Sequence, residues 1–221
     1  MTFLLIDTAT EKGWCACYSS TQLLFSIMLP FGNDQSKYLL PLMEKELEKN
    51  SNQIKELEFI GIGIGPGSYT GVRVGASVAK ALAYGWNIPL VAFSTLSAFV
   101  YQEEGIPFYS VIDAKLGGIY LQKGIVENHK LNILEEPRVM PLEMLTTWTE
   151  TKPILVTPYK TSLLAKTKSL APNFEGDWIE ADPNSSLIAD LALHSFLKGN
   201  IAHPKNLPLN YLREWSGTPP N

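Results

Sequence analysis

The spacing of apolar residues near the start of the chain predicts a small sheet followed by a helix. Short apolar runs separated by polar turns are typical of strands, and they predict a meander over Phe3–Ile6, Trp14–Ser19 and Leu23–Leu29. Over Gln35–Lys49 the apolar residues instead recur at helical spacing, on both sides of Pro41. We therefore expect an amphipathic helix in that segment.

A strand, a glycine turn and a second helix follow. Phe59–Ile64 is apolar or glycine throughout, and the turn Gly65-Pro66-Gly67 separates it from helical spacing over Tyr69–Tyr84. The pattern then predicts another strand over Ile88–Phe93 and another helix over Thr95–Tyr101. Strand, glycine turn and helix are thus the organising unit of this half of the chain.

The polar segment 102–105 predicts a boundary between a first lobe, residues 1–104, and a smaller second lobe, residues 105–221. We leave open whether the C-terminal tail returns to the first lobe. The second lobe begins as the first does, because an apolar strand ends at Asp113 before a glycine turn, as the first strand ends at Asp7. Duplication and ordinary turn chemistry explain this repeat equally well.

The rest of the second lobe alternates helices with a strand. We expect helices over Leu142–Thr149, Thr161–Leu170 and Leu187–Leu197, a strand over Ile154–Thr157, and an irregular tail from Pro204. Either Ser185 or Ser186 is expected to cap the last helix. Strands that alternate with helices after a meander indicate an α/β protein with mixed sheets.

Composition and charge remove several classes of protein. Hydrophobic residues make up 45% of the 221 residues and charged ones 18%, which excludes disordered, collagen-like and coiled-coil chains. The net charge of -4 argues against a broad basic face for nucleic acid. Cys15 and Cys17 are expected to be small buried residues, and with no secretion signal or membrane span in the pattern we expect a cytoplasmic protein.

The glycine-rich segment 61–71 is the densest chemical signal. Glycines at a strand-to-helix turn allow backbone N–H groups to approach a phosphate at the helix N-terminus. The segment fits neither the Walker loop nor the strict dinucleotide motif. A tight turn in which Ser68 or Thr70 caps the helix explains the same glycines, so both interpretations stay open.

Two carboxylates stand at the ends of predicted strands. A cleft between lobes could gather Asp7 and Asp113 around a metal–nucleotide complex, although either could equally cap a turn. The three histidines are scattered and lack the spacing of a helical zinc site, so we expect no metal centre.

Small residues recur at every fourth position behind the glycine turn. Gly71, Gly75, Ala79 and Ala83 would form a furrow along one helix face that another helix can approach closely. The spacing does not say whether that helix belongs to the same chain or to another.

Several segments together resemble the bacterial TsaB (YeaZ) family. The resemblance rests on Leu5–Thr10, Gly65–Gly75, Ser94–Leu96, Ile112–Gly117 and Tyr211–Arg213. It covers most of the first lobe and is loose over 126–208. The family implies the two-lobed actin, heat-shock ATPase and sugar-kinase fold, with duplicated mixed-sheet lobes facing a nucleotide cleft.

The resemblance also implies a function. TsaB-like proteins are non-catalytic partners of the TsaD-type transferase, which makes threonylcarbamoyladenosine on the tRNA adenosine beside the anticodon, and a TsaE-type ATPase docks on the assembly. We expect a TsaD-like heterodimer, a homodimer when the chain is alone, and tRNA contact only through the complex. TsaD-like proteins carry a histidine pair on the first-lobe helix, and residues 35–47 contain no histidine.

The resemblance assigns residues to two sites and no residue to catalysis or to a metal. A nucleotide cleft would be lined by Asp7, Thr8, Thr10, Lys12, Gly65, Gly67, Ser68, Thr70 and Asp113. The partner interface would use the first-lobe helices, through Leu39, Met43, Leu47, Gly71, Arg73, Gly75, Ala79 and Ala83.

One departure from the fold's ATPases bears on the cleft. Ala9 stands where those ATPases usually have glycine, and its methyl group would crowd a phosphate. We therefore expect no required cofactor, with weak ATP or ADP binding left open. The alternative function is a stand-alone small-molecule kinase or ATPase of the same fold.

Overall fold

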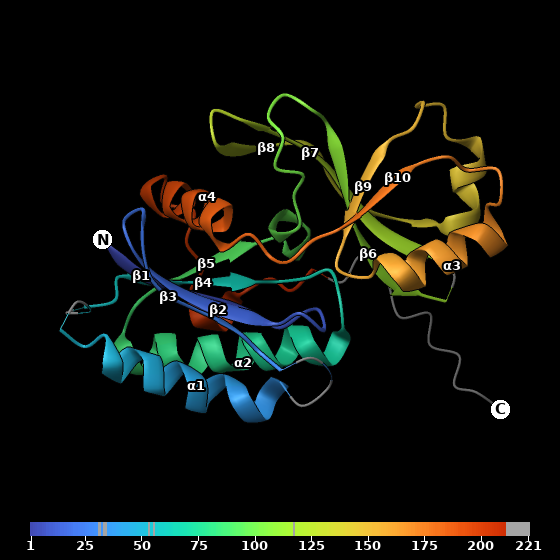
Figure 1. Cartoon of the computed structure of the whole chain (residues 1–221). Helices are drawn as coiled ribbons and strands as arrows, with labels where there is room; N and C mark the ends of the chain where they lie inside the picture. Colours follow the sequence, from blue (N-terminus) through green and yellow to red (C-terminus); the bar gives the residue numbers. More distant parts are fainter. Residues whose placement is uncertain (31, 33–34, 53, 55, 117, 211–221) are drawn as a thin grey trace, which may run out of the picture.

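A computed structural model describes residues 1–30, 32, 35–52, 54, 56–116 and 118–210, which form two five-stranded sheets lying side by side (Figure 1). The first sheet has the strand order β3-β2-β1-β4-β5 and the second β10-β9-β6-β7-β8.

The first sheet and its nearby helices are built from β1 (Thr2–Asp7), β2 (Trp14–Ser19), β3 (Gln22–Met28), α1 (Gln35–Lys49), β4 (Phe59–Gly63), α2 (Tyr69–Trp86) and β5 (Leu90–Phe93). A 3-10 turn over Thr95–Ala98 leads to β6 (Phe108–Lys115), β7 (Gly118–Glu127), β8 (Lys130–Pro141), a 3-10 segment over Leu142–Thr147, β9 (Ile154–Thr157), α3 (Lys160–Leu170), β10 (Asp177–Glu180), α4 (Ser185–Leu197) and a last 3-10 turn over Pro204–Asn206.

The two sheets repeat one topology. In the first, an antiparallel meander of β1, β2 and β3 is extended by β4 and β5 as parallel strands, and β6 to β10 follow the same scheme in the second. The hydrogen bonding at the end of the first strand of each sheet is also repeated. Asp7 Oδ1 accepts the N–H of Ala9 at 2.8 Å, and Asp113 Oδ1 accepts the N–H of Lys115 at 2.8 Å. The structure therefore decides in favour of duplicated lobes.

Both faces of the first sheet are covered, which explains why β1 is apolar at successive positions. Leu4 and Ile6 join the core beneath α1 and α2, whereas Phe3 and Leu5 join the core on the other face. α1 and α2 lie on one side of this sheet and α4 on the other (Figure 1). A central strand with two buried faces loses the alternation that would otherwise mark it as a strand.

The last described part of the chain, from α4 to Leu207, packs on the first lobe. Phe196 of α4 stacks on Phe59 of β4 with ring centroids 4.6 Å apart. Further on, Ala202 pairs with Leu90 of β5, and Leu207 is buried in the core beneath α1 and α2. The sequence placed α4 within the segment 105–221 and left open whether the tail returns to the first lobe; in the structure α4 and the tail as far as Leu207 pack on the first sheet.

Most predicted elements are present, and four differ. The expected helices at Thr95–Tyr101 and Leu142–Thr149 are short 3-10 segments, and β8 and β10 were not expected. β8 is a half-exposed edge strand in which charged residues interrupt the apolar positions, so its periodicity is weak. The cap of α4 is Asn184, whose side chain accepts the N–H of Leu187 at 3.1 Å, and neither Ser185 nor Ser186.

The structure also bears on the predictions for the two cysteines, for membrane spans and for the tail. Cys15 and Cys17 are free and buried, as predicted, and burial raises the pKa of each thiol to about 12. No helix in the described ranges is long and apolar enough to span a bilayer. The resemblance at Tyr211–Arg213 and the last part of the tail lie outside the described residues.

Candidate functional site

Asp7, at the end of β1, is the most enclosed of the predicted cleft residues. Its side chain is buried against Gly63, where a Cβ atom would come within 2.2 Å of the carboxyl carbon. Oδ2 has no hydrogen-bond partner among the described residues. Burial raises the pKa of this carboxyl from 3.8 to about 6, because desolvation penalises the charged form. The hydrogen bond from the Ala9 N–H and an interaction with the Thr95 side chain offset part of this rise.

The glycine turn packs against the hairpin that joins β1 to β2. Ser68 donates its N–H to the carbonyl of Ala9 at 2.7 Å, and a Cβ atom on Gly67 would lie 2.2 Å from the same oxygen. The Thr8 hydroxyl donates to the carbonyl of Gly71 at 2.7 Å. The glycines are therefore required by a close approach of two backbone segments of this chain.

Ser68 is the N-cap of α2, because its side chain accepts the N–H of Gly71 at 3.2 Å. Thr70 is exposed in the first turn of that helix. Gly65 has a φ of +94°, which favours glycine, and it exchanges hydrogen bonds with Thr95. In the structure, the backbone of this segment therefore forms a capped turn at the start of α2.

The N-terminus of α1 holds the same hairpin from a second side. Gln35 is buried, and its Nε2 donates to the carbonyls of Thr10 and Glu11 at 3.0 and 2.8 Å. Its side chain also fills the space beside Gly13. Gln35 is therefore a structural clamp on the hairpin.

Side chains of the second lobe contact the hairpin from a third side. Lys12 Nζ contacts Asp182 Oδ1 at 2.8 Å and Glu180 Oε1 at 3.4 Å, at the end of β10 and beyond it. The hydroxyl of Tyr159 accepts the N–H of Glu11 at 3.0 Å. These contacts join residues far apart in the sequence and fix the two lobes relative to each other.

Asp113 occupies the position in the second lobe that Asp7 occupies in the first, but its surroundings differ. Lys166 of α3 approaches Asp113 Oδ2 to 2.6 Å, and Lys115 Nζ lies 3.6 Å from the same oxygen. Asp113 is therefore neutralised by cations of its own lobe, whereas no cation of the described residues forms an ion pair with Asp7.

Tyr159 lies where the two halves of the predicted cleft meet. Burial raises the pKa of its phenol to about 12, and the charges of Glu11 and Asp113 add to the rise. The structure thus gathers the hairpin and Asp113 around Tyr159. The sequence contained no signal for Tyr159 or for Lys166, since neither lies in a motif or in a recognisable spacing.

We expect Tyr159→Phe to lower the free energy of unfolding by about 1–3 kcal/mol, because the partly buried N–H of Glu11 would lose its acceptor. Chemical denaturation measures this change. Tyr84→Phe is the control, since Tyr84 is 78% exposed, and it should change stability by less than about 0.5 kcal/mol. Equal effects of the two variants would show that the interlobe hydrogen bond contributes nothing.

The predicted interface residues are mostly internal. Leu39, Met43, Ala79 and Ala83 belong to the buried core between α1, α2 and the first sheet, and Gly75 is buried against Thr8. The prediction that they form a partner surface is corrected, because this sheet covers them. Leu47 is half-buried on the same core.

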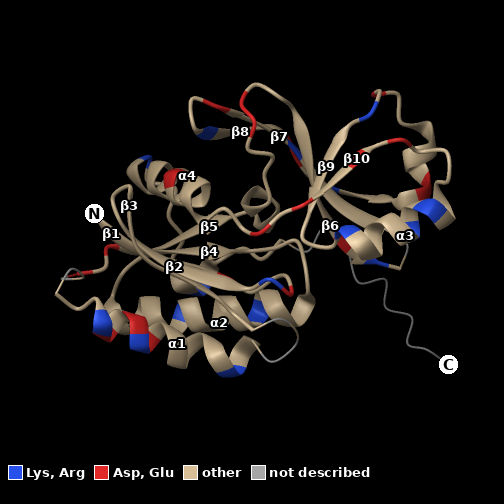
Figure 2. Ribbon diagram, viewed as in Figure 1, with Lys and Arg blue, Asp and Glu red and all other residues tan. Residues whose placement is uncertain are grey.

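A different set of side chains faces outward from the two helices. We define the outer helix face as Leu40 of α1 with Tyr69, Arg73 and Tyr84 of α2; Arg73 lies 3.9 Å from the Tyr69 ring centroid. Tyr69 is 57% and Tyr84 78% exposed. Acidic and basic residues are interspersed along α1 (Figure 2). Large residues opposite the small-residue stripe were the sequence signal for this face.

Comparisons with known proteins show which family has this architecture. The family model described as tRNA N6-adenosine threonylcarbamoyltransferase, TsaD, matches residues 33–155. TsaB from Bacillus subtilis, called a tRNA threonylcarbamoyladenosine biosynthesis protein, is 31% identical over 173 residues, which are 74% of this chain and 73% of that protein. The chain belongs to the TsaB (YeaZ) family.

TsaB from Haemophilus influenzae is 31% identical over 138 residues, but the match spans 58% of this chain and only 55% of that relative. YeaZ from Pseudomonas aeruginosa has a TM-score of 0.75 at 21% identity, covering 93% of this chain and 96% of that structure. The likeness to YeaZ, together with the match to the TsaD family model, supports the two-lobed actin-like fold.

Within this TsaB-family fold, several of the predicted cleft residues are engaged by other groups of this chain. The turn donates to the hairpin, Lys12 is paired across the lobes and Asp113 is paired with Lys166. Among the described residues, no group of three or more His, Cys, Asp or Glu side chains could hold a metal ion.

Proposed function

We propose that this chain is the non-catalytic partner that binds and activates a TsaD-type transferase in the synthesis of threonylcarbamoyladenosine on tRNA. The relatives' names support the pathway, and the outer helix face supports the role of partner. Leu40, Tyr69 and Tyr84 project large apolar surfaces from the side of a helix pair that does not face the core. Aromatic residues and arginine are enriched at the centres of protein interfaces.

The state of the cleft supports a non-catalytic role. A phosphate bound at the glycine turn would need the N–H of Ser68, which Ala9 already accepts at 2.7 Å. A metal–nucleotide complex would need charged carboxylates from both lobes. Lys166 and Lys115 occupy the Asp113 carboxylate, and burial raises the pKa of Asp7 to about 6, which favours its uncharged form. We propose that no nucleotide is required and that any ATP binding is weak.

The outer helix face also supports a homodimer when no transferase is present. A surface that buries apolar side chains against a partner leaves them exposed in the monomer, and pairing with a second copy would cover them at about 25 cal/mol per Å². We propose that the TsaD-type partner replaces this second copy, that a TsaE-type ATPase then joins, and that tRNA is held through the complex in the cytoplasm.

Omission from a reconstituted reaction tests the proposed function. Threonylcarbamoyladenosine on tRNA is measured with a TsaD-type transferase, a TsaE-type ATPase and the threonylcarbamoyl-adenylate donor, with and without this chain. The proposal requires product only when the chain is present. Equal product without it would refute the proposal, and phosphate release from ATP by the chain alone would favour the kinase or ATPase alternative.

Leu40→Glu is expected to abolish transferase binding and product formation without unfolding the chain. Leu40 is 46% exposed, so a carboxylate there is tolerated in the free chain but would be desolvated at an interface. Leu134→Glu is the matched control, since Leu134 is 50% exposed on β8 of the second lobe. Size-exclusion chromatography with the transferase and the reconstituted reaction report the outcome. Loss of binding in both variants would contradict the assignment of the interface.

A further inference from the structure

The free edge of β3 has backbone groups directed away from the sheet. β3 is the first strand in the order β3-β2-β1-β4-β5 and pairs only with β2 in the described part of the chain. The hydrogen bond from Leu29 N–H to the Gly13 carbonyl, 2.8 Å, continues this ladder. Because hydrogen-bonded positions alternate in an antiparallel pair, the neighbouring Met28 and Ser26 direct their N–H and C=O groups outward.

Within Gln22–Met28 this edge lacks most of the features that usually prevent another strand from pairing, and Pro30 lies beyond the segment. β3 contains no charged residue and no proline, and Leu23 and Met28 are 48% and 47% exposed. Natural edge strands are generally protected by lysine, proline, a covering loop or a marked bulge. The irregularity in the pairing of β2 with β3 lies between Cys17 and Tyr18, which leaves Ser26 and Met28 in regular register.

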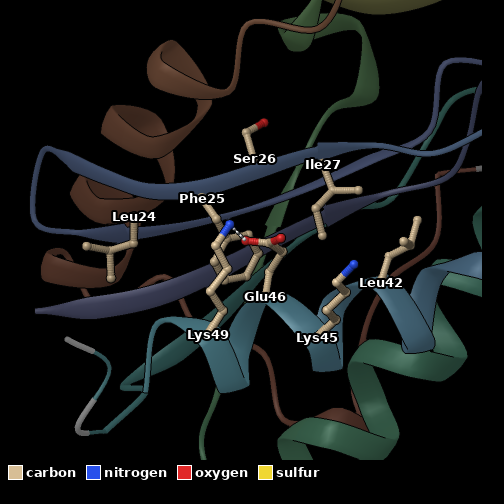
Figure 3. A pocket seen from close by; sticks show the side chains of 8 residues that line it. All are labelled: Leu24, Phe25, Ser26, Ile27, Leu42, Lys45, Glu46 and Lys49. Atoms are coloured by element: carbon tan, nitrogen blue, oxygen red, sulfur yellow. Dashed lines mark hydrogen bonds and ion pairs between the residues drawn. The ribbon is translucent and has the colours of Figure 1, made fainter. Parts of the chain in front are cut away.

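A groove of about 470 Å³ runs between this edge and α1 (Figure 3). It is lined by Leu24, Phe25, Ser26 and Ile27 of β3 and by Leu42, Lys45, Glu46 and Lys49 of α1. Neighbouring side chains of a strand point to opposite faces, so a groove touched by four consecutive strand residues lies along the backbone edge.

The chemistry of the groove is apolar with a basic rim. Leu42 and Ile27 line it from opposite elements, so apolar side chains can enter between them (Figure 3). Glu46 is paired with Lys49 at 3.4 Å, and no ion pair joins Lys45 to another described residue. One positive charge is therefore left uncompensated at the rim, which favours an acidic occupant.

We propose that β3 binds an extended, acidic segment of another protein as an added strand. Its backbone pairs with the outward groups of Ser26 and Met28, alternate apolar side chains enter the groove, and a carboxylate meets Lys45. This mode is β-strand addition, in which main-chain hydrogen bonds supply affinity and side-chain pockets supply specificity. The site is distinct from the outer helix face and does not depend on the proposed function.

The test uses the isolated full chain and two synthetic probes, the peptides Thr-Val-Glu-Ile-Glu-Val and Thr-Val-Lys-Ile-Lys-Val. Amide hydrogen exchange followed by NMR reports on single N–H groups. The amides of Ser26 and Met28 are expected to exchange freely in the chain alone and to be protected by the acidic peptide. The lysine peptide is expected to bind at least about tenfold more weakly, with salt reducing the difference.

Two pairs of variants separate the backbone contribution from the charge. Ser26→Pro removes the outward N–H without touching the ladder to β2, so it should abolish peptide binding, whereas Ser26→Thr should retain it. Lys45→Glu should weaken binding of the acidic peptide about tenfold, and Lys45→Arg should not. Thermal unfolding of each variant confirms that it is folded.

Three results would overturn the proposal. The acidic peptide could fail to protect the two amides, or it could bind Ser26→Pro as well as it binds the unaltered chain. Protection of Ser26 and Met28 in the absence of peptide, rising with protein concentration, would instead assign the edge to a second copy of this chain.

Discussion

Gly71→Ala is expected to destabilise the chain by about 3 kcal/mol or more, at or beyond the upper end of ordinary overpacking. A Cβ atom at this position would lie 2.1 Å from the carbonyl oxygen of Thr8 and 3.1 Å from its carbon. These are backbone atoms, and the Thr8 hydroxyl also donates to the carbonyl of Gly71, so the hairpin cannot withdraw without breaking that bond. Urea unfolding followed by circular dichroism measures the loss.

The same substitution elsewhere in α2 supplies the control. Gly85 has nothing within 4 Å of the position a Cβ atom would take, so Gly85→Ala should stabilise the chain by about 0.5–1 kcal/mol through helix propensity. The two variants differ only in what the methyl group meets. If Gly71→Ala proved as stable as the unaltered chain, the close approach between the hairpin and α2 would be wrong.

Asp7→Asn is expected to stabilise the chain above pH 6 by up to about 3 kcal/mol. The native carboxyl, with its pKa raised from 3.8 to about 6 by burial, keeps its proton at pH values where the unfolded chain has released it. The native state therefore binds more protons between pH 4 and pH 6, and stability falls as the pH rises through this window. Asparagine keeps the acceptor for the N–H of Ala9 and cannot ionise.

The measurement is the free energy of unfolding of both proteins from pH 4 to pH 8. The variant should lack the fall in stability that Asp7 imposes on the unaltered chain. Asp113→Asn is the matched control, since this residue has the corresponding place in the other lobe but is paired with Lys166 at 2.6 Å. Removing that carboxylate should destabilise the chain, which is the opposite sign. Identical pH profiles for Asp7→Asn and the unaltered chain would count against a buried, unpaired carboxyl.

Helix bounds and the repeated aspartate were the features near the glycine turn that the sequence could predict. The helix bounds Gln35–Lys49 and the start at Tyr69 were predicted correctly, because their periodicity and the Ser68 cap are local. The repeat of Asp7 and Asp113 was visible in the sequence, but chance explained it as well as duplication did. Only the matching strand orders of the two sheets decided between them.

The small-residue stripe shows where local reasoning ended. Spacing identified Gly71, Gly75, Ala79 and Ala83 as one face of a helix, but it did not identify what the face contacts. In the structure that face meets Thr8 and the first-lobe core, and the outward surface is carried by Tyr69, Arg73 and Tyr84. A helix has two sides, and the one that is covered depends on segments distant in the sequence.

The sequence by itself determined the family, the α/β class and the positions of the strand, turn and helix units, because these depend on motifs and on periodicities within single segments. Tertiary structure alone decided that α4 covers the first sheet, that Lys166 neutralises Asp113, and that β3 pairs with β2 alone among the described residues. Each of these is a contact, or a missing neighbour, between segments far apart in the chain, and no local pattern encodes which distant residues will meet.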